Sequence, residues 1–387
     1  MIRVLVPREC RPGETRVAAT PETVRRLSAR GCLLQVEQGA GAASGFDDDA
    51  YGEAGAQLID PAAAVGEAWS LADVVLAVQA GSIAQQRPEL EALRPGSLLL
   101  GLLEPHGNDA LKQQLEQQRL TAMALELLPR ISRAQTMDVL SSQANIAGYK
   151  AVLLASAALD RYVPMLMTAA GTIQPARALI LGAGVAGLQA LATARRLGAV
   201  AYVSDVRPAA KEQVESLGGR FIDPPELEQK PGETGGYAQQ ATEAFLAEQR
   251  RQLTEQLALA DMVICTAQVP GRPAPRLIDD AMLQHMRPGS VVVDLAVAQG
   301  GNCEGTEPGT TVLRHGVQLI GADALPCTVA NHASALYARN VAALLEHLLE
   351  HLLESCAADA PALQLNLEDP IVSGCLFTHH AAAGGAA

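Results

Sequence analysis

The amino-acid sequence predicts an α/β protein built from two parallel sheets, each with helices on both faces. Short apolar runs alternate with amphipathic stretches in the first third of the chain, and the alternation begins again after residue 176, which is typical of parallel sheets. Apolar residues make up 49% of the chain and aromatic residues only 3%, so cores of Ala, Leu and Val are expected. The 387 residues suffice for two separate cores. We therefore expect two Rossmann-like, doubly wound parallel-sheet domains joined by long helices.

The first series of elements begins with an apolar strand and a helix close to the N-terminus. Thr20 can cap a helix within residues 20–31, Pro21 suits its first turn and Gly31 ends it. The runs between such helices are rich in Val and Leu, as buried parallel strands are. Strands are predicted within residues 3–9, 33–41, 72–79, 97–105 and 120–128.

The second half of the chain repeats the pattern after a long helical stretch. Residues 133–170 contain few helix breakers and are expected to connect the domains as helix. Residues 333–355 predict a closing helix whose leucine stripe packs on the first domain or on a second copy, followed by a polar tail. The predicted domains are therefore residues 1–132 with 330–387, and residues 133–329. The second set of strands is predicted within residues 177–184, 199–205, 260–268, 289–297 and 317–323.

Charge and cysteine content exclude several classes of function. The net charge of −13 disfavours binding to nucleic acid or directly to anionic lipid. The seven cysteines contain no C-x-x-C pair, so neither a zinc site nor a redox pair is expected, and scattered thiols fit a reducing cytoplasm. The N-terminus lacks the pattern of a signal peptide. Residues 178–194 are apolar but short for a membrane span and contain three glycines, so they predict a strand, a turn and a helix rather than a span.

A glycine-rich turn opens the second domain. Gly182, Gly184 and Gly187 form the pattern G-x-G-x-x-G between a predicted strand and a predicted helix. In a dinucleotide-binding turn, the first glycine permits the tight turn and the second lets backbone N–H groups approach a pyrophosphate. The third lets the helix pack closely on the strand. The helix N-terminus adds partial positive charge beside the phosphates.

The carboxylate that ends the following strand indicates which nucleotide is bound. Asp205 lies 23 residues after Gly182, near the spacing of ~20 of a ribose-binding acid. A carboxylate there accepts hydrogen bonds from both adenine-ribose hydroxyls and repels a 2′-phosphate, so NAD(H) is expected rather than NADP(H). Arg207 complicates this, because a nearby arginine holds the 2′-phosphate in some sites. Asp205 has the greater weight because it stands at the strand end.

One segment breaks the strand–helix rhythm. Residues 223–255 are long, polar and rich in Gly and Pro, and a connection of this length is usually functional or disordered. One interpretation is a solvated excursion. The other is a mobile lid, with Gly235 and Gly236 as pivots and Tyr237 at its tip.

Several long, ordered motifs go beyond composition and spacing. They are PRECRPGETRVAATPETV (7–24), GAGAASGFDDDAY (39–51), PRISRAQTMDVLSSQANIAGYKAV (129–152), GETGGYA (232–238), TAQVPGRPAP (266–275), DLAVAQGGNCE (294–304) and LPCTVANHASALYARN (325–340). On these motifs the chain resembles the soluble NAD(H)-binding alpha subunit, domain I, of proton-translocating nicotinamide nucleotide transhydrogenases. That family is related to the alanine dehydrogenases, which share the first two motifs.

The resemblance implies roles for individual residues. Arg130 and Gln135 match a polar loop beside the nicotinamide, and Asp138 and Ser141 would fix its geometry. Without the resemblance, this stretch would read as a solvated helix start. Tyr237 matches the tip of a loop that closes over the nucleotide. The expected nucleotide-binding residues are Gly182, Gly184, Val185, Ala186, Gly187, Asp205, Arg207, Gly236, Tyr237, Thr266 and Ala267.

Two related activities can be separated on the residues they need. Alanine oxidation needs a cation for the substrate carboxylate and a base for the amine proton, and alanine dehydrogenases carry a Lys and a His on the loops after the third and fourth N-terminal strands. Here those positions hold Gln79 and a Leu or Glu, and His106 nearby reads as a turn residue. We therefore expect direct hydride transfer between NAD(H) and NADP(H) rather than amino-acid oxidation.

The transhydrogenase resemblance also implies partners. NADP(H) would bind a partner subunit, and membrane-spanning subunits would couple the transfer to proton translocation. The chain itself would be a homodimer, held peripherally at the cytoplasmic face of the inner membrane through those subunits. Two alternatives stay open: an alanine dehydrogenase-like oxidoreductase, and a non-catalytic NADH-binding regulatory module.

The closing helix carries histidines that could suggest a metal site. His347 and His351 share one helix face with Glu350 and Glu354 nearby. The favoured interpretation is the polar side of an amphipathic helix, and no metal is expected. The tail that contains His379 and His380 is expected to be disordered.

Overall fold

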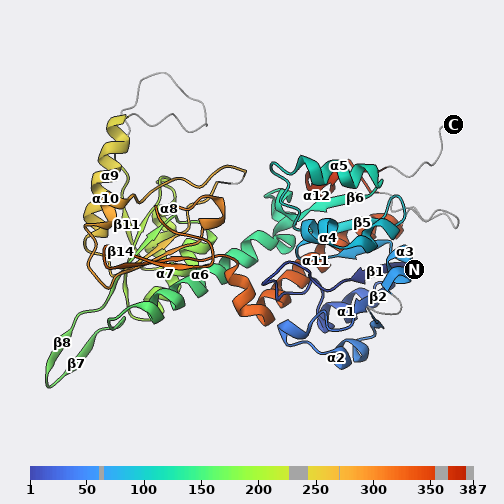
Figure 1. Ribbon diagram of the computed structural model, residues 1–387, viewed down its shortest axis with the longest axis horizontal. Coiled ribbons are helices and arrows are strands. Elements are labelled where there is room, and N and C mark those ends of the chain that lie inside the picture. Colours follow the sequence, from blue (N-terminus) through green and yellow to red (C-terminus); the bar gives the residue numbers. More distant parts are fainter. Residues whose placement is uncertain (61–64, 226–242, 270, 354–364, 381–387) are drawn as a thin grey trace. The chain divides into compact units, whose positions relative to one another are not determined.

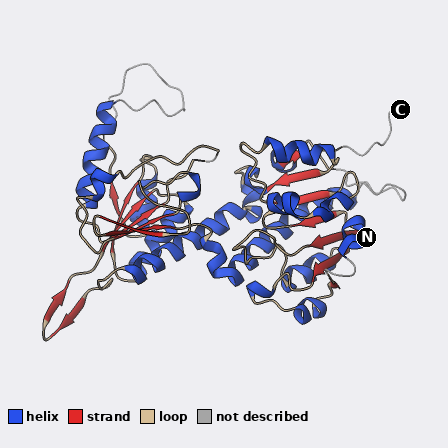
Figure 2. Cartoon of the chain, in the orientation of Figure 1, coloured by secondary structure: helices blue, strands red, loops and turns tan. Residues whose placement is uncertain are grey.

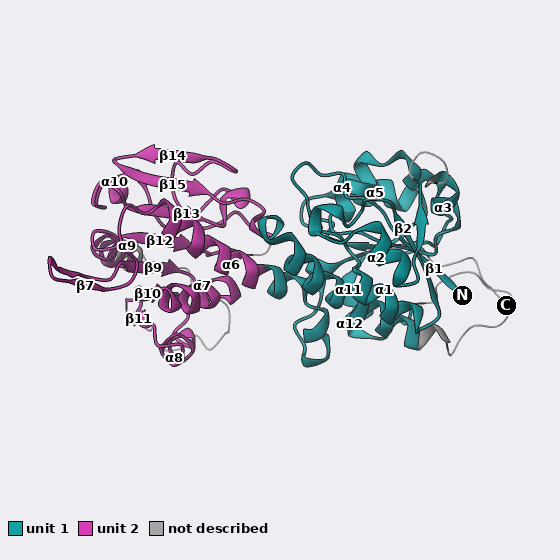
Figure 3. Cartoon of the chain, turned by 90° about the horizontal axis from the view of Figure 1, so that it is seen from below, with its two compact units in different colours: residues 1–143, 326–387 teal, residues 144–325 magenta. Residues whose placement is uncertain are grey.

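The computed structural model describes residues 1–60, 65–225, 243–269, 271–353 and 365–380 (Figure 1). The chain divides into two compact units, which Figure 3 colours separately. Unit 1 consists of residues 1–143 and 326–387, and unit 2 of residues 144–325. Figure 2 shows helices on both faces of a sheet in each unit, as the sequence predicts.

Unit 1 is built on a seven-stranded sheet with the order β16-β6-β5-β4-β1-β2-β3. The strands are parallel except for β16, which pairs antiparallel with β6. The five predicted strands are confirmed, whereas the two edge strands, β3 and β16, were not predicted, because most of their residues are not fully buried. The strands are β1 (Ile2–Val6), β2 (Cys32–Glu37), β3 (Gln57–Ile59), β4 (Val74–Leu76), β5 (Leu98–Gly101), β6 (Thr121–Ala124) and β16 (Leu376–Thr378).

The helices of unit 1 include the two that the sequence predicts, α1 and α11. Thr20 caps α1 in a reciprocal capping box with Thr23, and Pro21 is its first residue. The α-helices are α1 (Pro21–Ser28), α2 (Asp48–Glu53), α3 (Val65–Leu71), α4 (Ala80–Gln86), α5 (Asp109–Gln117), α11 (Ala330–Leu353) and α12 (Pro370–Cys375). The 3-10 helices are η1 (Ala42–Ser44), η2 (Pro88–Ala92), η3 (Leu125–Leu127), η4 (Ser132–Met137) and η6 (Leu325–Val329).

The closing helix α11 packs its apolar face on the core of unit 1. Tyr337, Leu344 and Leu348 lie in the same buried cluster as strands β1 and β4. The hydroxyl of Tyr337 donates to the carbonyl of Ala77 at 2.8 Å. Of the two expected positions for its leucine stripe, the first domain is therefore the one observed.

Unit 2 contains the second seven-stranded sheet, with the order β11-β10-β9-β12-β13-β15-β14. All five predicted strands are present, and only β14 runs antiparallel to its neighbour. The strands are β9 (Arg177–Leu181), β10 (Val200–Ser204), β11 (Arg220–Ile222), β12 (Met262–Cys265), β13 (Val291–Asp294), β14 (Thr311–Arg314) and β15 (Val317–Gly321). The helices are α6 (Val139–Ala158), which begins in unit 1, α7 (Val185–Arg196), α8 (Ala210–Ser216), α9 (Glu243–Leu257), α10 (Asp280–Leu283) and η5 (Val297–Gln299).

Three predictions of local structure are wrong. The helix expected over residues 133–170 ends at Ala158, and a hairpin of β7 (Leu166–Thr168) and β8 (Gly171–Ile173) projects from unit 2 (Figure 1). The end of the segment 223–255 is not loop but helix α9, because Leu253 and Leu257 bury one face of it. Of the tail expected to be disordered, His379 and His380 directly follow β16, and the N–H of His380 donates to Thr121 Oγ1 at 3.2 Å. Residues 381–387 lie outside the described residues.

None of the described helices combines the length and the apolarity that a membrane span requires. The apolar stretch of residues 178–194 forms β9, the glycine turn and α7, as predicted.

Candidate nucleotide site

A candidate site lies in unit 2 at the carboxyl edge of its sheet. The strand order reverses between β9 and β12, which pair in parallel. Loops leaving adjacent strands at such a point diverge to opposite faces and leave a crevice, where open α/β sheets bind their ligands. The loop after β9 contains the glycine motif, and the loop after β12 contains Thr266 and Ala267.

Each glycine of the motif meets a different geometric demand. Gly182 has φ +103°, and an added Cβ there would lie 2.7 Å from Thr266 Oγ1. An added Cβ on Gly187 would lie 1.9 Å from the carbonyl oxygen of Gly182, so α7 packs on the turn too closely for any side chain. An added Cβ on Gly184 would meet nothing within 4 Å. The space beside Gly184 is therefore open, as a pyrophosphate requires.

The first turn of α7 offers backbone donors to this space. Gly184 is the N-cap, and no side chain caps the helix. Within the described part of the chain, the N–H groups of Val185, Ala186 and Gly187 donate to no protein acceptor. Unused donors at a helix N-terminus, together with the helix dipole, form an anion site. The cradle thus fits the pyrophosphate of a dinucleotide.

Asp205 and Arg207 form a tight ion pair beside the glycine turn. Asp205 Oδ2 accepts the N–H of Ala183 at 2.7 Å and Arg207 Nη2 at 2.9 Å, and Oδ1 accepts the N–H and Nε of Arg207 at 2.8 and 2.9 Å. Burial raises the pKa of Asp205, but the hydrogen bonds from Arg207 and Ala183 outweigh it, and the net pKa is lowered. The carboxylate is therefore anionic and already holds four donors.

Thr266 and Ala267 form the wall opposite the glycine turn, and Asn302, which the sequence prediction missed, holds Ala267 in place. Thr266 Oγ1 donates to the carbonyls of Leu181 and Gly182 at 3.0 and 3.2 Å. The N–H and C=O of Ala267 both bond the side-chain amide of Asn302. Asn302 lies in the motif DLAVAQGGNCE. An asparagine in a loop is common, so the sequence alone did not mark this one as a residue that supports the site.

The four residues expected beside the nicotinamide lie in unit 1, apart in sequence from the glycine turn of unit 2. Arg130 and Gln135 have exposed side chains in and next to η4. Asp138 caps α6, because its Oδ1 accepts the N–H of Ser141 at 2.9 Å and its Oδ2 accepts Ser141 Oγ at 2.6 Å. Asp138 and Ser141 thus fix the junction between η4 and α6. Gly235, Gly236 and Tyr237 lie outside the described residues, so their expected role stays a prediction.

The carboxyl edge of the sheet in unit 1 holds a buried polar network. Arg16 pairs with Glu14 at 2.7 Å, and both side chains are buried. Gln79 donates to Glu14 Oε2 at 3.2 Å and accepts from Arg11 at 3.2 Å. His106 lies in an exposed turn before α5, as predicted. Each of the two cations of this network is therefore already paired with a carboxylate of the same chain, Arg16 with Glu14 and Arg11 with Glu104 at 3.1 Å.

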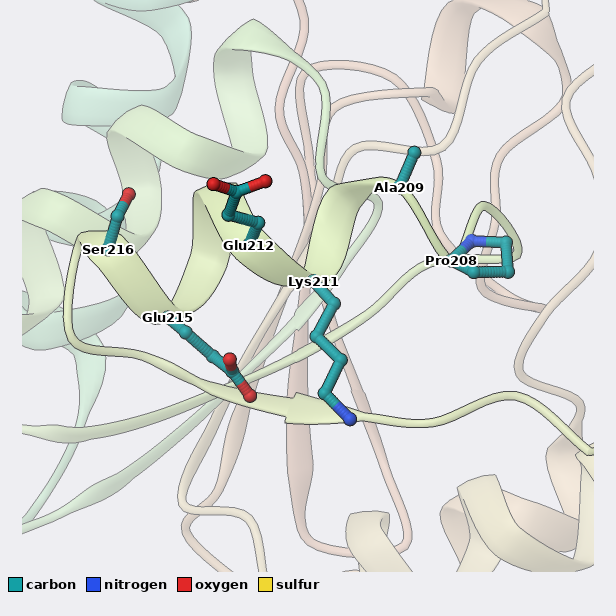
Figure 4. A pocket seen from close by; sticks show the side chains of 6 residues that line it. All are labelled: Pro208, Ala209, Lys211, Glu212, Glu215 and Ser216. Carbon is teal, nitrogen blue, oxygen red and sulfur yellow. The ribbon is translucent and has the colours of Figure 1, made fainter.

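Two other features carry no predicted site residue. An open hollow of about 550 Å³ lies along α8, where Figure 4 shows Lys211 and Glu215 on one side of the helix and Glu212 on the other. Its mixed charges do not favour binding of an anion.

His347 Nε2 lies 2.7 Å from Asp369 Oδ2, and this contact joins α11 to the start of α12. The described residues contain no cluster of side chains suited to a metal ion.

Comparison with known proteins places these features in a family. The N-terminal domain of the alanine dehydrogenase/PNT family matches residues 5–147, and its C-terminal domain matches residues 151–380. An NAD(P) transhydrogenase subunit alpha chain of Rhodospirillum rubrum is 46% identical over 383 residues, covering 98% of this chain and 97% of that protein.

A solved structure and a more distant relative agree with this. The crystal structure of transhydrogenase from Sinorhizobium meliloti has a TM-score of 0.84 and 42% identity, covering 98% of this chain and 99% of that chain. Alanine dehydrogenase of Bacillus subtilis is 30% identical over 311 residues, covering 79% of this chain and 73% of that protein. The chain thus belongs to the alanine dehydrogenase/PNT family, and within it to the NAD(P) transhydrogenase alpha subunits.

Proposed function

We propose that this chain is the NAD(H)-binding subunit of a proton-translocating transhydrogenase. Hydride passes directly between NAD(H) on this chain and NADP(H) on a partner subunit, and membrane-spanning subunits couple this transfer to proton movement. The observation that carries the proposal is the turn after β9. Its open space at Gly184, its free helix N-terminus and the adjacent Asp205 suit a dinucleotide, in a chain closely similar to named transhydrogenase subunits.

Different residues of the crevice would bind different parts of the nucleotide. The backbone of Val185, Ala186 and Gly187 would hold the pyrophosphate, and Asp205 the adenine ribose. Thr266 and Ala267 would line the opposite wall of the crevice. All four acceptor positions of the Asp205 carboxylate are occupied. Arg207 would therefore give up one or more of its hydrogen bonds to Asp205 when the ribose hydroxyls bind.

The reaction demands positioning rather than acid–base chemistry. The nicotinamide carries the hydride, and no proton is exchanged at the reacting carbons. The protein must bring two rings to about 3–3.5 Å and exclude water. We propose that Arg130 and Gln135 orient the nicotinamide. Their side chains are exposed and free to take a ligand, while Asp138 and Ser141 hold the backbone from which they project.

Oxidation of an amino acid is the second candidate, and the network in unit 1 disfavours it. A substrate carboxylate needs a cation, but Gln79 carries no charge. Arg16 is buried against Glu14, and Arg11 pairs with Glu104. The exposed His106 is held in a turn. A regulatory module that binds NADH without catalysis would share the glycine turn, but it would not need Arg130 and Gln135.

The assembly is part of the proposal. We propose a homodimer that uses the hairpin β7–β8, since Met165, Met167 and Ile173 on or beside it are exposed, Met167 to 71%. Side chains of this kind favour burial against another chain. Docking on membrane-spanning partner subunits would place the protein at the cytoplasmic face of the inner membrane. Sedimentation of the wild type and of Met167→Ser would test the dimer, which the substitution is expected to weaken.

Reconstitution tests the activity. The purified chain is added to membranes that hold transhydrogenase membrane subunits but lack the alpha subunit, with NADPH and an NAD analogue whose reduced form absorbs at its own wavelength. Reduction of the analogue that depends on this chain is expected, with no oxidation of L-alanine by NAD⁺. If the membranes reduce no analogue although the chain binds NADH, the chain is a nucleotide-binding module without catalytic activity. Oxidation of alanine would favour the dehydrogenase.

A further inference from the structure

Asn302 is fully buried on the loop after η5, and its side-chain amide is used completely. Oδ1 accepts the N–H of Ala267 at 3.0 Å, and Nδ2 donates to the carbonyls of Ala267 and Pro275 at 2.8 Å each. The amide therefore bonds the Ala267 backbone through both donor and acceptor, as a neighbouring strand would. No other residue type of this size offers a donor and an acceptor side by side.

The bonds of Asn302 close the base of the segment that follows β12. Ala267 stands at its start and Pro275 at its end, and one side chain joins them. The carbonyl of Asn302 also accepts the N–H groups of Leu277 and Ile278, at 2.8 and 3.0 Å. Both ends of the segment are thus fixed to a single residue.

Asn302 is itself held in place by a buried carboxylate. Asp294, at the end of β13, accepts the N–H groups of Ala296 and Cys303 at 2.9 Å each and the hydroxyl of Thr306 at 3.0 Å. It is fully buried, so these bonds are made in a low-dielectric interior, where they are stronger than in water. The loop that presents Asn302 is therefore preorganised.

The other end of this chain of bonds is the glycine turn. Ala267, clamped by Asn302, follows Thr266, whose backbone N–H donates to the carbonyl of Leu181 at 2.8 Å. The hydroxyl of Thr266 reaches the carbonyls of Leu181 and Gly182. The bonds thus run from Asp294 on β13, through Asn302 and the end of β12, to the turn after β9.

From this geometry we propose that Asn302 is a positioning residue for NAD(H). It touches no ligand itself, but it fixes the Thr266–Ala267 wall at the distance from Gly182 that the dinucleotide needs. The inference rests on the proposed function, because it assigns a role at that same crevice. Without the clamp, Ala267 could turn its N–H or C=O into the crevice, and the wall would lose its shape.

Asn302→Asp tests the inference with almost no change in volume. The carboxylate keeps the acceptor for Ala267 N–H but loses the donor, and it faces the carbonyls of Ala267 and Pro275. Loss of these two buried bonds predicts a rise of about tenfold in the Kd for NADH, measured by the fluorescence of the bound nucleotide. In the reconstituted enzyme, KM for the NAD analogue should rise while KM for NADPH stays unchanged.

A control variant loses the same kind of bond at an exposed asparagine of the other unit. Asn331→Asp also removes an Nδ2–H bond to a carbonyl, that of Ser44 in unit 1, at 2.9 Å. It should leave the Kd for NADH unchanged. If Asn302→Asp does not fold, Thr306→Val serves instead. It removes the hydroxyl that bonds Asp294 and the carbonyl of Cys303, at 3.0 and 2.8 Å, and should lower the melting temperature and raise the Kd for NADH about threefold.

The outcomes distinguish the inference from the function on which it rests. A folded Asn302→Asp protein that binds NADH as tightly as the wild type overturns the positioning role and leaves the proposed function intact. Equal rises in KM for both nucleotides would assign Asn302 to general stability and would also overturn it. A wild-type chain that does not bind NADH overturns the proposed function itself.

Discussion

Arg207 covers the carboxylate of Asp205 with three of its own donors, and the N–H of Ala183 supplies the fourth. The Arg207 side chain is 63% exposed and that of Asp205 is 6% exposed, so the arginine lies on the solvent side of the acid. A ribose that approaches Asp205 must share or displace Arg207. The two residues therefore form one recognition unit, in which the acid selects against a 2′-phosphate and the arginine could bind one.

Asp205→Asn is expected to change nucleotide preference. The amide no longer holds Arg207 as an ion pair and no longer repels a 2′-phosphate, so the guanidinium becomes available to that group. The ratio of the Kd for NADPH to the Kd for NADH should fall at least about tenfold, because one charged interaction is lost and another gained. Fluorescence titration of both nucleotides measures the ratio.

The double variant Asp205→Asn with Arg207→Gln is the control. If Arg207 binds the 2′-phosphate, the gain in NADPH affinity disappears while the loss of NADH affinity remains. A double variant that still gains NADPH affinity would show that removal of the acid alone relaxes the selection.

Gly184→Ala and Gly187→Ala are expected to weaken NADH binding for different reasons. The Cβ of alanine at 184 meets no protein atom, so melting temperature should be nearly unchanged while the Kd for NADH rises about tenfold or more, because the methyl group occupies pyrophosphate space. At 187 the methyl group would lie 1.9 Å from the Gly182 carbonyl oxygen, so α7 must shift and the melting temperature should fall as well. Thermal melts and NADH titrations of both variants separate the effects. A Gly184→Ala protein with unchanged NADH affinity would contradict the cradle.

The contrast between these glycines shows what the sequence could predict. The pattern and its place between an apolar strand and a helix located the turn, and alternation of apolar and amphipathic runs identified ten of the fourteen strands in the two large sheets. The four strands it missed are the edge strands of the two sheets, β3 and β16 in unit 1 and β11 and β14 in unit 2, and most of their residues are not fully buried. Their pairing comes from the neighbouring strand and not from their own composition.

The missed and mistaken elements depend on contacts distant in sequence. Helix α9 is polar overall, and only its packing through Leu253 and Leu257 distinguishes it from a solvated loop. Asn302 is one of many polar loop residues in the sequence, and its importance comes from bonds to Ala267, 35 positions away. The sequence showed that Arg207 lies two positions after Asp205. It did not show that Arg207, together with the N–H of Ala183, occupies every acceptor position of the carboxylate.

Gln135→Ala is expected to separate binding from transfer. The side chain of Gln135 is exposed on η4, so its loss should leave the melting temperature unchanged. If it orients the nicotinamide, kcat for transhydrogenation in reconstituted membranes should fall about tenfold to a hundredfold, since misplaced rings react slowly, while the Kd for NADH changes little. Thr136→Ala, on the same 3-10 helix, is the control and should retain the rate. Equal rates for wild type and Gln135→Ala would remove Gln135 from the reaction.

Glu9 is expected to make stability depend on pH near neutrality. Its carboxylate is enclosed and accepts the N–H groups of Val78 and Gln79 at 2.6 and 3.1 Å. Burial raises its pKa from 4.5 to about 7, more than these bonds and Arg16 lower it, and Glu14 adds repulsion. Between those two values the folded chain holds a proton that the unfolded chain has lost. The free energy of unfolding should therefore fall by roughly 3 kcal/mol as pH rises through this window.

Glu9→Gln isolates this contribution from the neighbouring carboxylate. Burial raises the pKa of Glu14, but bonds from Arg16 outweigh it and bring the pKa to about 2, so the stability due to Glu14 is present above pH 4.5 and lost only as pH falls towards 2. Urea unfolding from pH 4.5 to 8 should thus show a decline in the wild type that Glu9→Gln flattens, because the amide donates and accepts without titrating. Parallel curves for the two proteins would mean that Glu9 titrates alike in the folded and unfolded chains, and that its carboxylate is open to water.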